Sequence, residues 1–266
     1  MSFSGNMAYG LLRIVTAVFP AMKADFTDLP TELEKARKIN EKNRYVFPSD
    51  KKSLYKEIRT DGYPCLIIRS RKTKNKKDKG LLLIYGGNTL QWKSELAMAR
   101  YYGDRTGMDV WYPVYPPITE VNITVTTAVL CDVYDAMVKK YGTQNIAIVG
   151  DSIGGLLAAS MINHINRSQS GLGMPKLWIG NSPAGVPDTP EDWRELKKYA
   201  SRDPLFTVNA FRGLGKIAAH GQRTPKDAYC PIYMDFHNAP DTYLYYAEEI
   251  CAGNARAYRA AYEKAG

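Results

Sequence analysis

The chain has 266 residues, of which 45% are hydrophobic and 24% are charged, and its formal net charge is +9. This composition is that of a globular protein with a substantial buried core, and it excludes a disordered tail or a low-complexity segment. The four cysteines show no CxxC spacing and no pairing with histidines. Neither a zinc site nor a disulfide framework is predicted, and reduced thiols fit a cytoplasmic protein.

The chain opens with an apolar stretch whose spacing predicts an amphipathic helix. Arg13 interrupts the stretch, no basic segment precedes it as in a signal peptide, and it is too short to span a bilayer. We expect this helix to pack on its own protein, with a membrane-surface anchor as the alternative. Its apolar positions are Leu11, Leu12, Val15, Val18, Phe19 and Met22. A second helix is expected over residues 30–42, with Leu33, Ala36 and Ile39 on one face.

From Tyr45 onward, short apolar runs alternate with helical segments. This alternation predicts an α/β fold with a mostly parallel sheet that is covered by helices on both faces. Helices are expected at 95–106, 124–141 and 154–165. Strands are expected at 54–59, 65–69, 81–85, 110–113, 145–149, 176–179 and 242–246.

Residues 69–79, RSRKTKNKKDK, hold seven basic side chains against one aspartate and so carry most of the net charge. The segment lies between two apolar runs, and we interpret it as the exposed connection of a strand pair. No aromatic side chain interleaves its lysines, so a solvated loop is favoured over a nucleic-acid site.

Residues 193–220 are too long for a simple crossover between two strands. They predict a further helix that is capped by Thr207 and stopped by Gly221. The apolar stripe of this helix consists of Val208, Phe211, Leu214 and Ile217.

The run at 145–149 leads directly into GDSIGG, and a helical segment follows. Gly150, Ser152 and Gly154 form the pattern G-x-S-x-G, which by itself occurs by chance in roughly one chain in ten of this size. Its place between a buried strand and a helix makes it more specific, because a sharp turn there puts Ser152 at the carboxyl edge of the sheet and directs the N–H of Ile153 at an oxyanion. The sequence IYGGN after the third run can supply further N–H donors. A plain turn is the alternative.

Three segments, LLLIYGGN, VWYPVYPPITE and IAIVGDSIGGLLAA, resemble in order and spacing the hormone-sensitive-lipase type of α/β-hydrolase, a group that includes bacterial acetyl esterases. The later segments IGNSPAGVPDT and SRDPLFT are also similar to that family. The resemblance implies an eight-stranded sheet, a homodimer, and cofactor-free hydrolysis of carboxylic esters. It implies Ser152 as the nucleophile and the N–H groups of Gly86, Gly87 and Ile153 as the oxyanion hole.

The resemblance also implies one domain with a helical cap. We expect the core at about 45–192 and 222–266, and the cap at about 1–44 and 193–221. Two positions depart from the family pattern: Tyr85 stands where the family has histidine, and Asn88 where it has a third glycine. Asparagine tolerates left-handed backbone better than most residues, so Asn88 is expected to preserve the loop. Tyr85 leaves the backbone donors in place but bears on loop rigidity and acyl preference.

In this fold the catalytic acid and then the histidine follow the serine along the chain. The segment after the seventh run contains Glu248 and Glu249. Alignment with the family's acid favours Glu249, and Glu248 is the alternative.

The histidine is harder to place, because only three are present. His164 lies twelve residues into the helix after the serine, about 18 Å along its axis. His237 precedes the seventh strand and belongs at the amino edge of the sheet, away from the catalytic edge. His220 ends the inserted helix, where a contact with the helix dipole explains it. We therefore expect the catalytic histidine, and the eighth strand, after Gly266 in a longer form of the chain.

The sequence thus predicts a serine carboxylesterase that cleaves small, short-acyl esters through an acyl-serine intermediate, with no metal, no nucleic acid and no membrane span. A non-catalytic hydrolase-fold protein that binds a ligand explains Tyr85, Asn88 and the missing histidine together. A basic protein that binds polyanions through residues 69–79 explains only the charge.

Overall fold

A computed structural model describes residues 24–266, apart from residues 75, 91, 169 and 248. The predicted N-terminal amphipathic helix lies outside the described residues, and so does Glu248. Within the described part of the chain, no helix is both long enough and apolar enough to cross a bilayer.

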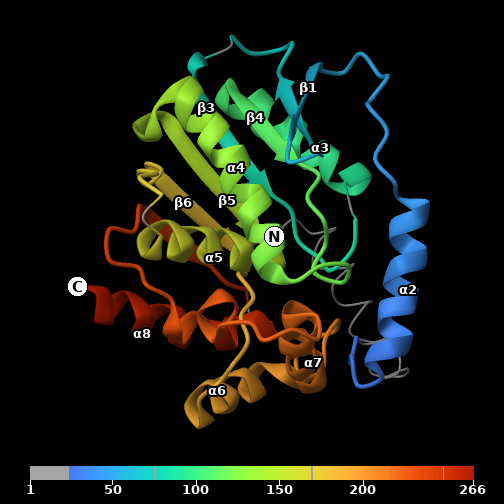
Figure 1. The fold of residues 1–266 in the computed structure, drawn as a ribbon, viewed down its shortest axis with the longest axis vertical. Coiled ribbons are helices and arrows are strands. Elements are labelled where there is room, and N and C mark those ends of the chain that lie inside the picture. The colour runs from blue at the N-terminus through green and yellow to red at the C-terminus, as the bar shows by residue number, and fades with distance from the viewer. Residues whose placement is uncertain (1–23, 75, 91, 169, 248) are drawn as a thin grey trace.

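The described strands form one sheet in the order β1-β2-β4-β3-β5-β6-β7 (Figure 1). β1 and β2 form an antiparallel hairpin, β2 pairs antiparallel with β4, and all other neighbours are parallel. The predicted α/β sheet is therefore confirmed with seven strands, while the implied eighth strand is not among the described residues. The strands are β1 (Leu54–Thr60), β2 (Tyr63–Arg69), β3 (Lys76–Ile84), β4 (Met108–Pro113), β5 (Ile146–Asp151), β6 (Leu177–Asn181) and β7 (Asp241–Tyr245).

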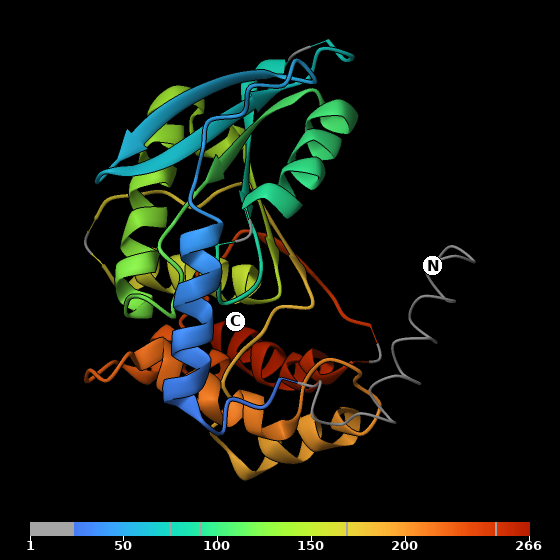
Figure 2. The ribbon, with the colours of Figure 1, turned by 90° about the vertical axis from the view of Figure 1, so that its right-hand side faces the viewer.

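The helices cover both faces of this sheet. Figure 2 shows α3 and α4 on opposite sides of the strands. The helices are α2 (Leu29–Lys42), α3 (Trp92–Thr106), α4 (Ile123–Tyr141), α5 (Ile153–Arg167), α6 (Pro190–Ala200), α7 (Val208–Ala219) and α8 (Ala255–Ala265). Short 3₁₀ turns lie at η2 (Thr143–Asn145), η3 (Lys226–Ala228), η4 (Pro231–Tyr233) and η5 (Ile250–Asn254).

Apolar periodicity and local caps account for these elements. β3 runs through the middle of the sheet, and because helices cover both faces its last four residues, 81–84, are all apolar and all buried. The Thr207 hydroxyl caps α7 by accepting from the Ala210 N–H, as predicted. α7 ends at Ala219 and is followed by two left-handed residues, His220 and Gly221. The predicted end of the helix before Gly221 is therefore confirmed, with the left-handed backbone beginning one residue earlier, at His220. The same segment contains a second helix, α6, which begins with a capping box between Thr189 and Asp192.

The interpretation of residues 69–79 as the connection of a strand pair is wrong in one respect. β2 and β3 are not neighbours, because β4 lies between them. The connection crosses the end of β4, and its last residues, from Lys76 onward, are already part of β3. Alternation of polar and apolar residues cannot predict this, because the order of strands depends on pairing far along the chain.

α2 stands beside the sheet rather than against it. Figure 2 shows this helix running between the end of the molecule that holds β1 and β2 and the end that holds α6 and α7. Its predicted bounds are confirmed: Asp28 caps it by accepting from the Thr31 N–H, and Pro30 occupies its first turn. The space between α2, α7 and the carboxyl edge of the sheet contains the site described next.

Candidate active site

Ser152 alone makes the turn between β5 and α5. Its backbone has φ 53° and ψ −115°, a conformation that a residue with a side chain rarely adopts. Two hydrogen bonds hold it: the Ser152 N–H donates to the Asn181 carbonyl (2.9 Å), and the Ala184 N–H donates to the Ser152 carbonyl (3.0 Å). The sharp strand-to-helix turn that the sequence predicts is confirmed. Hydrogen bonds to the last residue of β6 and to the loop after it hold the strained backbone of Ser152 in place.

Glycine is required where the loop after β3 meets this turn. A Cβ at Gly154 would lie 2.1 Å from the Ile84 carbonyl oxygen, and a Cβ at Gly86 would lie 2.7 Å from the Asp151 carbonyl oxygen. Contacts this short do not occur between real atoms, so both positions exclude a side chain. The YGGN loop therefore packs directly on the serine turn.

The predicted oxyanion donors come from two elements that end at the same edge of the sheet. Ile84 is in register with Gly150, so β3 and β5 finish side by side. Gly87, Ser152 and Ile153 all line one cavity. Ile153 opens α5, where the first N–H groups have no intrahelical acceptor and the helix dipole favours negative charge.

Tyr115 fixes the orientation of the peptide before Gly86. Its hydroxyl donates to the Tyr85 carbonyl, and its ring stacks on the Tyr85 ring with centroids 4.4 Å apart. In a trans peptide the carbonyl and the following N–H point in opposite directions. Because Tyr115 holds the Tyr85 carbonyl on one side of the loop, the N–H of Gly86 faces the other side. Tyr85, at the family's histidine position, is thus part of a buried aromatic stack.

Asn88 does not use the left-handed conformation that asparagine tolerates. The left-handed residue is Gly87, with φ 88°, and Asn88 is not among the described residues of positive φ. The Thr119 hydroxyl donates to the Asn88 carbonyl and fixes the loop at this point. Gly87 therefore supplies the backbone freedom that this loop requires.

α2 is clamped to the same loop at Leu90. The Leu90 N–H donates to the Asn40 side-chain oxygen (2.7 Å), and the Asn43 side-chain amide donates to the Leu90 carbonyl (3.1 Å). The Asn40 amide also donates to Glu120 (2.6 Å). Asn40 itself is 2% exposed, whereas Glu120 is exposed. The helix that forms one wall of the cavity is therefore tied to the loop that carries Gly86 and Gly87.

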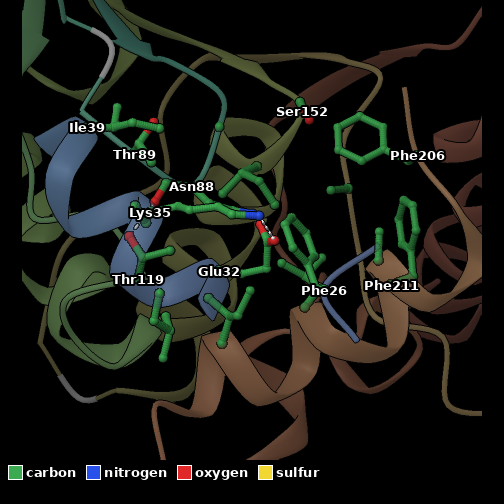
Figure 3. A pocket seen from close by; sticks show the side chains of 18 of the residues that line it. Phe26, Glu32, Lys35, Ile39, Asn88, Thr89, Thr119, Ser152, Phe206 and Phe211 are labelled. Atoms are coloured by element: carbon green, nitrogen blue, oxygen red, sulfur yellow. Dashed lines mark hydrogen bonds and ion pairs between the residues drawn. The ribbon is translucent and has the colours of Figure 1, made fainter. Parts of the chain in front are cut away.

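The cavity above Ser152 has a volume of about 320 Å³ and a mostly apolar lining. Figure 3 shows Ser152 and the Phe206 ring at one side of it, and the ion pair between Glu32 and Lys35 further along (2.7 Å). α2 and α7 provide facing walls, and Phe26 lies between them. The apolar wall residues are Leu33, Ala36 and Ile39 from α2, and Ala210, Phe211, Leu214 and Ile217 from α7.

Glu249 lies just before η5, whose residue Cys251 lines the same cavity. One carboxylate oxygen, Oε2, accepts from the Cys251 N–H (2.8 Å). The other, Oε1, is shielded from solvent and has no hydrogen-bond partner among the described residues. Burial raises the pKa of Glu249, and interactions with the Cys251 N–H and the nearby Ser182 hydroxyl oppose that rise. An orphaned acceptor of this kind is the position from which a carboxylate orients a histidine.

None of the three histidines lines the cavity. His164 is exposed on α5 and His237 is exposed beside Asp235, its Nδ1 3.0 Å from a carboxylate oxygen. His220 forms the left-handed end of α7. These placements agree with those expected from the sequence.

Two further carboxylates, those of Asp151 and Glu95, lie near the serine turn. Asp151 accepts from the Asn181 side chain (2.7 Å). Burial raises its pKa, and burial together with the Asp151 charge raises the pKa of Glu95. Neither carboxylate lines the cavity.

Sequence reasoning missed the residues that support the site from a distance. Tyr115, Thr119 and Asn40 each bind a main-chain group of residues 85–90, but they lie 30, 31 and 50 positions away from it in the chain. Their only sequence signal is a polar residue within an otherwise apolar or helical stretch. Such a residue is far more often exposed than bonded to a distant loop.

Solved structures share this fold. A candidate esterase from Staphylococcus aureus is 22% identical, with a TM-score of 0.75, and the match covers 92% of this chain and 82% of that chain. An esterase of the bacterial hormone-sensitive lipase family is 18% identical, with a TM-score of 0.71 and coverage of 89% and 85%. EstE5, whose crystal was soaked with p-nitrophenyl butyrate, is 17% identical, with a TM-score of 0.73 and coverage of 100% and 86%. At these identities the likeness establishes the fold.

A search of curated proteins finds no match to this sequence. A family model described as the alpha/beta hydrolase fold matches residues 120–266, which is more than half of the chain and includes the serine turn and the segment of Glu249. With its parallel sheet, its strained serine turn and this match, the chain belongs to the α/β-hydrolase family.

Proposed function

We propose that this protein is a serine carboxylesterase. The observation that carries the proposal is the strained turn at Ser152, which opens into a mostly apolar cavity that Gly87 and Ile153 also line. Strain of this kind, stabilised by surrounding loops, is typical of catalytic positions. The esterase names of several structures with the same fold support the same reaction.

In the proposed reaction, Ser152 Oγ attacks the ester carbonyl and its proton passes to a base. The N–H groups of Gly86, Gly87 and Ile153 stabilise the negative charge on the carbonyl oxygen. The tetrahedral intermediate expels the alcohol, which takes the proton from the base, and leaves an acyl-serine. Water then attacks the acyl-serine by the same route and releases the carboxylic acid.

We propose that Glu249 orients the base through Oε1. This oxygen is buried, and no described residue donates a hydrogen bond to it. An imidazole N–H is the donor that this reaction requires at such a site. Because the three histidines of this sequence lie away from the cavity, we assign the base to an imidazole that binds between Glu249 and Ser152.

We propose small esters with short acyl groups as substrates. The cavity of about 320 Å³ is at the small end of ligand sites, which span about 300–1,000 Å³. We further propose that α2 and residues 193–221 form a cap over it, since their side chains make up its two walls. The four cysteines are free and buried, which supports a reducing, cytoplasmic location. Family resemblance supports a homodimer.

The test is hydrolysis of p-nitrophenyl acetate and butyrate by the 266-residue chain and by Ser152→Ala, with and without added imidazole. We expect imidazole to accelerate the chain in a saturable way and to leave Ser152→Ala at the rate of imidazole in buffer. A fluorophosphonate should label Ser152, as mass spectrometry would show. Identical rates for both proteins, together with no labelling, would contradict the esterase proposal.

One observation favours a second candidate, a ligand-binding protein without catalysis: no histidine of the sequence lines the cavity. In that case p-nitrophenyl butyrate would bind equally to the chain and to Ser152→Ala in calorimetry, and neither would release p-nitrophenol at any imidazole concentration.

A further inference from the structure

The positive charge of this protein is concentrated in one part of the molecule. Residues 44–109 contain 15 basic and 7 acidic side chains, a net charge of +8 out of the total of +9. These residues form α3 and the strands β1, β2, β4 and β3, which are the first four in the order of the sheet and so make up one half of it. The remaining residues are close to neutral. Such asymmetry creates a directional electric field and favours an anionic partner on this side.

A groove of about 340 Å³ lies within this charged region. It shares no lining residue with the cavity at Ser152. Lys52 and Lys72 enter it from the loops before β1 and after β2, and Arg100, Tyr101 and Asp104 enter it from α3. Arg100 is paired with Asp50 and its side chain is only 17% exposed, so the most accessible cations at this groove are the lysines. Arg105, one turn further along α3, lies over the Tyr101 ring (5.4 Å from its centroid). We call the surface formed by Lys52, Lys72, Arg100, Tyr101 and Arg105 the basic face.

The loop that carries Lys72 is fixed to α3. The Ser70 hydroxyl donates to an Asp104 carboxylate oxygen (2.6 Å), and the Thr73 hydroxyl donates to the Asp104 carbonyl. The Lys72 ammonium binds the other carboxylate oxygen (3.0 Å). The start of this segment is therefore fixed to α3, while basic side chains of the segment stay exposed, as the sequence predicts: the Lys72 side chain is 76% exposed.

Exposed apolar side chains border the basic face. Phe47, Met98 and Tyr101 are 46%, 43% and 52% exposed. Met98 and Tyr101 are three residues apart on α3 and so lie on one side of it. The Phe47 ring contacts the Tyr55 ring, over which Arg100 lies. Cations and exposed apolar groups thus share one contiguous surface.

We propose that the basic face docks on a membrane surface that contains anionic lipids. Lysine and arginine attract the anionic headgroups, while Phe47, Met98 and Tyr101 enter the boundary between headgroups and acyl chains. The apolar groups decide against nucleic acid, since contacts with phosphates do not use Phe47 or Met98. This docking is independent of the proposed esterase reaction, because it involves no residue of the cavity at Ser152.

The experiment is co-sedimentation with vesicles of phosphatidylcholine alone or with 30% phosphatidylserine. We expect binding only to the anionic vesicles and its loss at high salt. Lys52→Gln with Arg105→Gln should weaken binding about 25-fold, since each cation near an anionic surface contributes roughly fivefold. The matched control is Lys197→Gln with Lys216→Gln, two exposed lysines on α6 and α7, of which Lys216 is also in the last turn of its helix. Control binding should be unchanged.

A second variant tests the apolar contribution at constant charge. Phe47→Ser with Met98→Ser should weaken binding to anionic vesicles severalfold, and circular dichroism should show that both double variants fold. Equal binding to neutral vesicles, or equal loss in the control variant, would overturn the proposal. So would unchanged vesicle binding by the apolar variant together with equally tight binding of a DNA duplex, which would indicate a polyanion site instead.

Discussion

At the scale of single residues, Ser152 and the groups around it differ in what they contribute. In the proposed reaction Ser152 supplies the reactive oxygen, and its backbone is held by the Asn181 carbonyl and the Ala184 N–H. The loop of the proposed oxyanion donors is likewise held by side chains from elsewhere in the fold, those of Tyr115, Thr119 and Asn40. The site therefore depends on positioning residues, whose removal should alter rates without altering the reactive group.

Tyr115→Phe tests this at the Tyr85 carbonyl. The ring stack is retained, but the Tyr85 carbonyl loses its donor, so the peptide that carries the proposed Gly86 N–H donor is no longer held in one orientation. We expect Ser152-dependent turnover to fall about tenfold or more at nearly constant KM, since one oxyanion donor is worth about 10²–10³ in kcat. The buried, unpaired carbonyl should also lower the free energy of unfolding by about 1–3 kcal/mol.

The matched control is Tyr112→Phe. Tyr112 is buried in the same aromatic group, but its hydroxyl makes only a long contact of 3.4 Å with the Trp92 carbonyl. Steady-state kinetics with p-nitrophenyl butyrate and urea unfolding would separate the two variants. Equal kcat for both would remove Tyr115 from the site.

Glu249→Gln should separate stability from activity. Because burial raises the pKa of Glu249, the folded state binds a proton more readily than the unfolded state. The free energy of unfolding therefore falls as pH rises from the ordinary glutamate pKa through the raised value. Glutamine does not ionise, so the variant should be as stable as the wild type or more stable at pH 7, and this difference should disappear at low pH.

The activity of the same variant should move the other way. If Glu249 orients the base, imidazole-dependent turnover should fall roughly 10²-fold or more. Thermal denaturation at pH 4 and pH 7 and the imidazole titration are the measurements. A destabilised variant with unchanged turnover would assign Glu249 a structural role in capping η5.

Local chemistry explains which residues could be predicted. The serine turn could be predicted because strand, turn and helix follow one another within about twenty residues, and glycines mark the turn itself. Tyr115 could not, because its partner depends on β3 and β4 lying side by side, which no periodicity encodes. Intrinsic preference shows that asparagine tolerates left-handed backbone, but it does not show which loop residue uses it, and in this loop Gly87 does so at no steric cost.

At the scale of elements, α2 is the helix whose place the sequence left open. Its bounds followed from Asp28, Pro30 and the apolar spacing, but its attachment is made by polar side chains near its end. Asn40 and Asn43 bind both main-chain groups of Leu90, much as a neighbouring strand would. Hydrogen bonds therefore tie a wall of the cavity to the loop that carries the proposed oxyanion donors.

Asn40→Ala should uncouple them. The variant leaves the Leu90 N–H and the Glu120 carboxylate without their partner, and we expect a loss of about 1–3 kcal/mol in the free energy of unfolding. KM for p-nitrophenyl butyrate should rise with it, because α2 lines the cavity. Exposed Lys38→Ala on the same helix is the control for helix stability alone. A rise in KM in both variants would argue against the clamp.

At the scale of the whole molecule, segments far apart in the chain meet at the cavity. α2 precedes the sheet and α7 lies within the long insertion, yet Ala36, Ile39, Leu214 and Ile217 line the same space. The groove of the basic face and the cavity at Ser152 have no lining residue in common. The residues proposed to bind a membrane are therefore not residues of the cavity walls.

Leu214→Trp tests the volume of the cavity. The larger side chain occupies space between α2 and α7, so turnover of p-nitrophenyl butyrate should fall several-fold relative to that of the acetate. Leu196→Met, at a buried α6 position that does not line the cavity, is the control for a changed side chain in the core. An unchanged ratio of the two substrates would place the acyl group elsewhere.

The clamp between α2 and Leu90 also bears on how the chain folds. α2 is made before any strand of the sheet, but its polar partners lie 50 and 80 residues further along the chain. It cannot dock until β3 and β4 have brought residues 90 and 120 together, and contacts of such long separation form late. The helix should therefore detach in local opening before the sheet unfolds, with faster amide exchange in residues 29–42 than in β3 and β5. The cavity would then be assembled last in folding and opened first in unfolding.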